Sequence, residues 1–375
     1  MEDVRLLMLP GPVPLPERVC QAMMRQAINH RGPEFGAAYT ESVAVLKECF
    51  GTENEVFILS GSGTAGMDAA ISNFGKGKKI ASLVNGKFGD RLYQIAARNG
   101  DATEIASEWG TPVDLAALEE ALENGAEMVT MVHNETSAGI LNPAKEVGRL
   151  ARKHDALFVM DGVTSVGGDE VLVDEWGVDV AIVGSQKCLA APAGLAAVTV
   201  SDRAWDRIVE DRPFYLDLAA CRKSAHKEPM QTPYTPAVPL FLGLHEALMM
   251  IKEEGMEARV ARHRRMSASV RAAVAAWGLE MFPQLDEHSA YSNTVTAVRM
   301  PEGVADVGGR VKQMGIEIAG GQDHLKGKIF RIGSMGAVSA PEILATLAAV
   351  QHALRKAGVA GVGDGVEAAA EVLNP

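Results

Sequence analysis

The sequence has 375 residues, of which 47% are hydrophobic and 22% charged, a composition typical of a globular protein with a large core and two or three domains. Its formal net charge of −12 argues against a protein that binds nucleic acid or an anionic membrane surface by electrostatic attraction. The four cysteines lack metal-ligand or disulfide spacing, and neither a secretory signal nor an apolar run of membrane-spanning length is present, so we expect a cytoplasmic protein.

The first half of the chain alternates between short apolar runs and segments with helical spacing. Residues 1–15, rich in proline and apolar residues, predict an extended N-terminal arm. Strands are then predicted at 56–60, 79–84, 127–132, 156–160 and 178–183, and helices at 61–74, 88–98, 113–125 and 144–154. This alternation predicts an α/β fold with a mostly parallel sheet covered on both faces. Ligand sites in such sheets lie beyond the carboxyl ends of the strands.

The second half has a different pattern. A proline-rich loop at 227–240 precedes a long helical region, from about 240 to 277. Strand-like segments at 294–298, 316–321 and 328–333, with helices near 305–314 and 341–357, predict a smaller α+β domain. We therefore divide the chain into an arm (1–15), a large domain (16–255) and a small domain (256–375). The tail after about residue 358 has no pattern that we can interpret.

The glycine-rich loop GSGTAG, residues 61–66, opens a predicted helix and matches GxGxxG. A dinucleotide fold would need an acidic residue at the end of the next strand, but that strand ends in Asn85 and Gly86. A nicotinamide-dependent oxidoreductase is therefore a weaker alternative. Small residues at the start of a helix also leave backbone N–H groups free to bind a phosphate. A tight turn with an ordinary helix cap would have the same sequence pattern.

Two charged residues follow buried strands of the predicted sheet. Asp161 comes directly after 156–160, and Lys187 follows 178–183 one strand unit further along. The carboxyl ends of neighbouring parallel strands meet at one edge, so these two side chains could lie together. Alternatively, Asp161 caps the next turn and Lys187 reaches out to water.

The remaining strand-end loops supply an aromatic ring and several polar groups. Phe88 is either a core residue or a plate against a ligand ring. His133 has no second histidine at ligand spacing, so we expect a hydrogen-bonded histidine and no metal site. Glu135 and Ser137 could be capping groups only.

A phosphate cradle, a carboxylate, an aromatic plate and a lysine together indicate pyridoxal 5'-phosphate. The sequence resembles the class V aminotransferases of the fold-type-I pyridoxal-phosphate family, and within it the alanine–glyoxylate and serine–pyruvate aminotransferases. The resemblance covers nearly the whole chain and rests on the motifs SGSGT, NGKFG, HNETSAG, DGVTSVGG, GSQK, TPYTP and KIFRIG. It implies a mostly parallel large domain and a smaller α+β C-terminal domain.

The resemblance assigns five residues to the cofactor ring. It implies that Lys187 forms the Schiff base and that Asp161 pairs with the pyridine nitrogen. Phe88 would stack on one face of the ring and Val163 would pack against the other, while Thr136 would bond the ring hydroxyl. A protonated pyridine nitrogen strengthens the cofactor as an electron sink.

The resemblance also assigns residues to the phosphate and the substrate. The phosphate would be held by Ser62, Gly63, Thr64 and Gln186. Thr235 would reach the phosphate of the neighbouring subunit, because sites in this family form at the interface of a homodimer. Arg331 would hold the substrate carboxylate, for which a planar guanidinium is suited; alone, it could equally be a surface ion pair.

The activity implied is transfer of an amino group from a small L-amino acid, alanine or serine, to a 2-oxo acid, glyoxylate or pyruvate, by a ping-pong mechanism. Val13 and Thr232 depart from the family pattern, and no second arginine is assigned to a side-chain carboxylate, which favours small substrates over dicarboxylates. A cysteine desulfurase is an alternative, although Gln186 stands where those enzymes have a histidine. A non-catalytic relative is disfavoured by the intact Lys187, Asp161 and Arg331.

Overall fold

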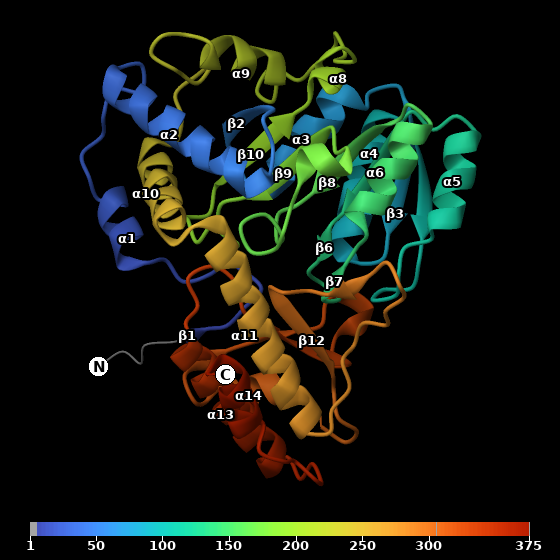
Figure 1. The fold of residues 1–375 in the computed structure, drawn as a ribbon, viewed down its shortest axis with the longest axis vertical. Coiled ribbons are helices and arrows are strands. Elements are labelled where there is room, and N and C mark those ends of the chain that lie inside the picture. Colours follow the sequence, from blue (N-terminus) through green and yellow to red (C-terminus); the bar gives the residue numbers. More distant parts are fainter. Residues whose placement is uncertain (1–5, 305, 375) are drawn as a thin grey trace.

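The computed structural model describes residues 6–304 and 306–374, and its larger part is built on a seven-stranded sheet (Figure 1). In spatial order its strands are β2 (Glu55–Ser60), β10 (Leu195–Val200), β9 (Val180–Gly184), β8 (Leu157–Asp161), β5 (Met128–Val132), β3 (Lys79–Val84) and β4 (Asp101–Ala106). The pairs from β9 to β4 are parallel, and β10 is antiparallel to both β9 and β2. The predicted α/β fold with a mostly parallel sheet is confirmed.

Two strands of this seven-stranded sheet were not predicted from the sequence, each for a physical reason. β4 is the edge strand, and most of its side chains are exposed or half-buried, so it carries polar residues in place of an apolar run. β10 is fully buried but contains two alanines, which have low strand propensity. Because β10 runs antiparallel to β9, the chain reverses direction in the turn between these two strands, and Lys187 lies in that turn.

Helices cover both faces of the sheet because alternate residues of each strand point to opposite sides. In β8, Phe158 and Met160 join the core beneath α2 (Pro33–Phe50), α5 (Leu115–Glu123), α6 (Ala144–Lys153) and α10 (Val238–Glu254). Leu157 and Val159 join the core beneath α3 (Gly63–Phe74), α4 (Lys87–Asn99), α8 (Asp202–Trp205) and α9 (Leu218–Ala225). The shorter helices α1 (Glu17–Met23) and α7 (Val173–Trp176), with the small strands β6 (Asn134–Glu135) and β7 (Ile140–Leu141), complete this part.

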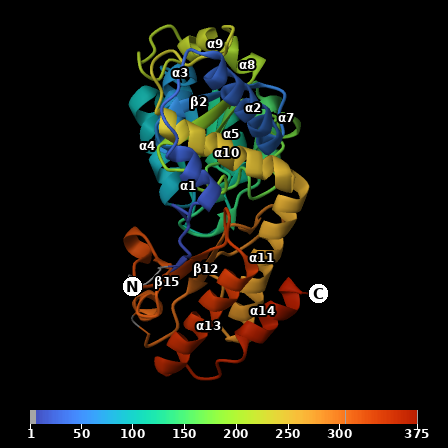
Figure 2. The same cartoon turned by 90° about the vertical axis from the view of Figure 1, so that its left-hand side faces the viewer.

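The smaller part lies below the sheet in both views (Figure 2). Its antiparallel strands, in the order β12 (Val295–Arg299), β15 (Ile329–Gly333) and β14 (Ala319–Gly320), share an apolar core with α11 (Met256–Ala276), α12 (Val307–Lys312) and α13 (Ala340–Lys356). Short elements β11 (Ala290–Tyr291), β13 (Ile316–Glu317) and the 3-10 helix η1 (Asp323–Leu325) complete it. The division of the chain into domains at about residue 255 stays a prediction.

The long helical region predicted from about 240 to 277 is confirmed, but it consists of two helices. α10 ends at Glu254 and α11 begins at Met256, because Gly255 adopts a φ of 80° that interrupts the helical backbone. Figure 2 shows that α10 stays with the sheet while α11 runs down into the smaller part. The longest helix has 21 residues, and none of the helices in the described ranges is long and apolar enough to cross a membrane.

The N-terminal arm joins the two parts and passes over the sheet edge. β1 (Leu6–Leu7) pairs in parallel with β13, and the backbone of Met8 bonds to Glu317 and Gly333. Further along, the Val13 N–H donates to the carbonyl of Gln186. The arm is therefore held at both ends, and its middle lies next to Lys187. The first five residues of the predicted arm lie outside the described residues.

The tail that the sequence left uninterpreted forms α14 (Gly365–Leu373), which packs along α11 and α13. Asp364 caps it by accepting from the Val366 and Glu367 N–H groups, each at 3.2 Å. Its first residue is fixed from inside the core, since Gln351 Oε1 accepts from both the Gly365 N–H at 2.7 Å and Trp277 Nε1 at 3.0 Å.

We expect the substitution Gly365→Ala to weaken this docking. A Cβ atom at Gly365 would lie 2.3 Å from Nε1 of the buried Trp277, so one of the two must shift. Overpacking of this kind costs about 1–3 kcal/mol, and the thermal unfolding midpoint should fall. Glu371→Ala, at an exposed position of the same helix, is the control and should leave the midpoint unchanged. Equal midpoints for both variants would contradict the packing described for α14.

Candidate active site

A cavity of about 130 Å³ lies at the carboxyl ends of the sheet strands. It is lined by Ser62, Gly63, Thr64, Met67, Phe88, Arg91, Asn134, Thr136, Asp161, Val163, Thr164, Gln186 and Lys187. Every residue that the sequence assigned to the cofactor is in this set except Thr235. The strand-end loops therefore meet in space as the fold prediction requires.

Lys187 is held in a rigid turn between β9 and β10. The Ser185 hydroxyl donates to the carbonyl of Pro192 at 2.5 Å, and the Ala191 N–H donates back to Ser185. The Lys187 ammonium donates to the carbonyl of Pro10 at 2.5 Å. Gly11 must be a glycine here, since its φ is +85° and a Cβ would lie 2.4 Å from Lys187 Cδ. The arm backbone thus lies directly against the lysine side chain.

The pKa of Lys187 is lowered to about 8, chiefly by burial; the positive charge of Arg331 adds to this shift, while Cys188 and Asp161 oppose it. With this pKa, about a tenth of the amine is neutral at pH 7, a far larger fraction than for an ordinary lysine. A neutral amine is both a nucleophile and a proton acceptor.

Asp161 ends β8 and is only 2% exposed. One oxygen, Oδ1, accepts from the Val163 N–H at 2.8 Å, but no cation pairs with the carboxylate within residues 6–304 and 306–374. Burial is the main cause that raises its pKa to about 7. A buried carboxylate without a cation is unfavourable, and a bound cationic nitrogen would relieve it.

The phosphate end of the cavity is the start of α3. Ser62 makes no side-chain capping bond, so the first N–H groups of a 12-residue helix stay available to an anion. Gln186 Oε1 is buried and without a hydrogen-bond partner. Since amide oxygen and nitrogen assignments can be exchanged, Gln186 can present an N–H to the same point. A phosphate ester fits these donors.

Phe88, in the first turn of α4, and Thr136, in the turn after β6, are tied together by one buried carboxylate, Glu135. Its Oε2 accepts from the N–H groups of Phe88 at 3.1 Å and Gly89 at 2.9 Å, at the start of α4. Its Oε1 accepts from the N–H of Ser137 at 3.0 Å and from its hydroxyl at 2.5 Å. A Cβ on Gly86 would meet Glu135 Cγ at 2.2 Å. Glu135, on β6, thus fixes the backbone position of Phe88.

The ring pocket is bounded by polar groups as well as by Phe88 and Val163. The hydroxyls of Thr136 and Thr164 bond to each other at 2.8 Å. Asn134 donates to Thr164 and Thr294, while its Oδ1 is buried without a partner. A planar, polar-edged ring with a phosphate, a cationic nitrogen and a carbonyl that reacts with an amine therefore matches what this cavity leaves unsatisfied.

His133 is adjacent but outside this cavity. Its Nδ1 shares a hydrogen bond with the Ser165 hydroxyl at 3.0 Å, and its ring contacts Trp176 edge-on at 5.2 Å. Burial lowers the pKa of His133 to about 4, so it is neutral. Within the described ranges no group of three or more His, Cys, Asp and Glu side chains could hold a metal ion.

Arg331 and Thr235 do not line the cavity. Arg331, on β15, is 5% exposed and donates from Nη1 to Thr136 O at 2.8 Å and from Nε and Nη2 to Gly320 O at 3.0 and 2.8 Å. Its charge nevertheless influences Lys187, so it is near the site. Thr235 is exposed, with His30 Nε2 at 3.5 Å from its hydroxyl.

The two departures from the family pattern are both buried. Val13 packs with Cys188, Ala190, Val295 and Met335 and has no polar function to replace. Thr232 donates to the carbonyl of Tyr234 at 2.7 Å and so stabilises its own loop.

Sequence reasoning missed four lining residues: Met67, Arg91, Asn134 and Thr164. Arg91 could have been found, since it lies three residues after Phe88 on a predicted helix and shares its face. Asn134 and Thr164 sit within the HNETSAG and DGVTSVGG segments, but nothing in their spacing separates them from ordinary loop residues.

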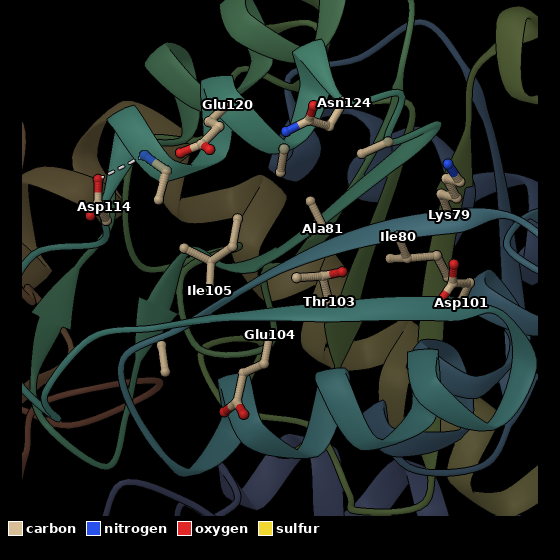
Figure 3. Close-up of a pocket in the computed structure, with 14 residues that line it drawn as sticks. Lys79, Ile80, Ala81, Asp101, Thr103, Glu104, Ile105, Asp114, Glu120 and Asn124 are labelled. Atoms are coloured by element: carbon tan, nitrogen blue, oxygen red, sulfur yellow. Dashed lines mark hydrogen bonds between the residues drawn. The ribbon is translucent and has the colours of Figure 1, made fainter.

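A second, larger cavity of about 530 Å³ runs along the edge strand β4, beneath α5 (Figure 3). It shares no lining residue with the Lys187 cavity. The dashed line in Figure 3 is the helix cap, in which Asp114 accepts from the Ala117 N–H at 2.9 Å. Its walls combine alanines with the acidic residues Asp101, Glu104 and Glu120 and contain no lysine–carboxylate pair at a strand's carboxyl end. The chemistry therefore belongs to the smaller cavity.

Comparison with known proteins agrees with this geometry. The family model for class V aminotransferases matches residues 7–338. An uncharacterized aminotransferase of Methanocaldococcus jannaschii is 45% identical, over 98% of this chain and 97% of its own. A Synechococcus protein named the small subunit of a soluble hydrogenase is 40% identical over the full length of both chains.

Among solved structures, the crystal structure of ureidoglycine–glyoxylate aminotransferase from Bacillus subtilis has a TM-score of 0.93 and 33% sequence identity, covering 100% of this chain and 99% of that one. Pyridoxal 5'-phosphate, when bound, supplies the electron sink that these enzymes need. The chain therefore belongs to the class V aminotransferases, which are pyridoxal-phosphate-dependent enzymes of fold type I.

Proposed function

We propose that this enzyme transfers an amino group from a small L-amino acid, alanine or serine, to a 2-oxo acid, glyoxylate or pyruvate, in two half-reactions at one site. The observation that carries the proposal is that a buried lysine with a lowered pKa and a buried carboxylate line one cavity, after the ends of neighbouring strands. Glyoxylate as acceptor is supported by the name of the Bacillus subtilis enzyme, whose fold matches over the whole chain.

Lys187 is the residue that holds the cofactor and moves the proton. With the cofactor bound, Lys187 would carry it covalently, and the cofactor would supply the electron sink. The neutral amine of Lys187 would accept the α-proton of the substrate and hold it at Nζ. The carbonyl of Pro10, which accepts from the Lys187 ammonium at 2.5 Å, would support this protonated state. Asp161 keeps the pyridine nitrogen protonated by supplying the negative charge next to it.

The remaining cofactor contacts follow from the walls of the cavity. Phe88 and Val163 would enclose the cofactor ring, and Thr136 would bond its hydroxyl. The phosphate is held by Ser62, Gly63, Thr64 and Gln186 at the start of α3.

Arg331 binds the substrate carboxylate. Its guanidinium is fixed by three hydrogen bonds to Thr136 and Gly320, so its orientation is settled before substrate arrives. A small donor needs only this one arginine, and that supports alanine or serine over dicarboxylates.

A cysteine desulfurase needs a reactive thiolate, and three of the four cysteines are unsuited to this role. Burial raises the pKa values of Cys49, Cys188 and Cys221 to about 12. Cys20 is exposed on α1 and is not among the residues lining the cavity. These properties favour the aminotransferase.

We also infer a homodimer in which Thr235 reaches the phosphate of the neighbouring subunit. Its exposure, outside the cavity of its own chain, supports that role. The cytoplasmic location inferred from the sequence stays a prediction.

The substrate proposal is tested by the visible absorption of the cofactor-loaded enzyme. L-alanine alone should bleach the band of the lysine-bound cofactor, and glyoxylate added afterwards should restore it, because each half-reaction runs without the other substrate. L-aspartate should act much more weakly. A band that aspartate bleaches and alanine leaves intact would refute the small-donor assignment while keeping the cofactor.

Lys187→Ala should abolish both spectral changes. Loss of a general base alone lowers the rate by about 10²–10⁴-fold, and loss of the covalent link adds to this. Lys79→Ala, in the second cavity, is the matched control and should keep full activity. Wild-type turnover by the Lys187 variant would remove this residue from the mechanism.

Asp161→Asn should change the pH dependence of stability in the apoenzyme. The folded-state pKa is raised above the unfolded value, so the contribution of Asp161 is fully present below pH 4 and is lost as the pH rises towards 7. Asparagine keeps an acceptor for Val163 without the charge. The variant's thermal midpoint should therefore exceed that of the wild type by an amount that grows from pH 5 to 7 and then levels. A difference that shrinks with rising pH would show that the carboxylate is stabilised in the empty cavity.

A further inference from the structure

Arg91 is a cationic side chain in the cavity that no motif of the sequence assigns. It lies on α4, one turn after Phe88, and is half-buried. Its Nη1 donates to the Thr64 hydroxyl at 3.2 Å, and its guanidinium carbon lies 4.8 Å from the centroid of the Phe88 ring. It thus links the aromatic plate to the first turn of α3.

Arg91 has no acidic partner. In residues 6–304 and 306–374 no Asp or Glu oxygen lies within 4.0 Å of its nitrogens, although the chain has twelve more acidic than basic side chains. Lys87, on the same helix, pairs with both Asp90 and Asp323. A cavity-lining arginine that has no carboxylate partner of its own is suited to bind an anion from outside the chain.

The charge of Arg91 acts across the whole cavity. Burial is the main cause of the raised pKa of Asp161 and of the lowered pKa of Lys187, and Arg91 lowers both. Its guanidinium is therefore close to the groups on which the reaction depends.

We propose that Arg91 is a further anchor of the cofactor phosphate, acting together with the N-terminus of α3. Its bond to Thr64 occupies an acceptor site of that hydroxyl, which leaves the hydroxyl proton free to be donated to the phosphate. The guanidinium and the helix N-terminus then present positive charge to the same dianion. This inference rests on pyridoxal phosphate as the cofactor and extends the phosphate contacts beyond those assigned from the sequence.

The other anion that could reach Arg91 is the side-chain carboxylate of a dicarboxylic substrate. The contacts favour the phosphate, because the hydrogen bond of Arg91 goes to the first turn of α3. Arg331, the residue proposed for the substrate carboxylate, instead bonds to Thr136 and Gly320.

The test compares the affinity of the apoenzyme for pyridoxal phosphate with its affinity for pyridoxal, which lacks the phosphate. Arg91→Gln should weaken pyridoxal phosphate binding by about tenfold to a hundredfold, the range for a charge-assisted hydrogen bond, and leave pyridoxal binding unchanged. Arg91→Lys should lose less, because it keeps the charge. Arg98→Gln, at an exposed position of the same helix, is the matched control and should match the wild type.

A second readout uses inorganic phosphate and no cofactor. Phosphate should raise the thermal midpoint of the wild-type apoenzyme and raise that of Arg91→Gln much less. Equal weakening of pyridoxal phosphate and pyridoxal would overturn the proposal and assign Arg91 to positioning Phe88. Unchanged cofactor binding with a selective loss of activity towards aspartate would overturn it in favour of a dicarboxylate site. Failure of the wild type itself to bind pyridoxal phosphate would refute the cofactor, which is a separate result.

Discussion

Burial of two opposite charges at neighbouring strand ends is the constraint that organises this molecule. Desolvation disfavours the charged form of both groups, so it raises the pKa of Asp161 and lowers that of Lys187. In water such a pair would be a weak contact between ionised groups. In this cavity the pKa values of both groups instead lie close to pH 7. Each group can also interact favourably with a bound ligand. The carboxylate needs a cation, and the neutral amine can attack a carbonyl carbon.

The surrounding residues keep these two groups apart and in position. Asp161 is fixed by the strand that ends at it, and Lys187 by a turn closed at Ser185. Glu135 accepts from backbone N–H groups at the start of α4 and so holds Phe88 in position. Burial raises the pKa of the Glu135 carboxyl, but four hydrogen-bond donors face this carboxyl and favour its ionised form. Segments held by several hydrogen bonds in this way give the cavity rigid walls.

The sequence predicted the parts of the fold in which local pattern and final environment agree. β2, β3, β5, β8 and β9 are buried on both faces and therefore appear as apolar runs. The two strands missed in the sheet depend on their position in it. The break at Gly255 depends on one positive φ, and helix α14 depends on docking against Trp277. None of these causes leaves a clear pattern in the local sequence. In the site, a specific family resemblance identified residues by motif, but it could not find Arg91. Its partner Thr64 lies on another helix, and only the packing of α3 against α4 brings them together.

Backbone carbonyls hold the two basic side chains Lys187 and Arg331 in place. Pro10 accepts from the lysine, and Thr136 and Gly320 accept from Arg331. Carbonyl groups cannot change their charge, so these contacts orient the two cations without neutralising them. An ion pair in either place would have consumed the charge that an anionic substrate or cofactor must meet. The site therefore keeps three cations, Lys187, Arg331 and Arg91, without ion-pair partners among the described residues. A strongly acidic chain has in this way preserved a local excess of positive charge where its ligands are anions.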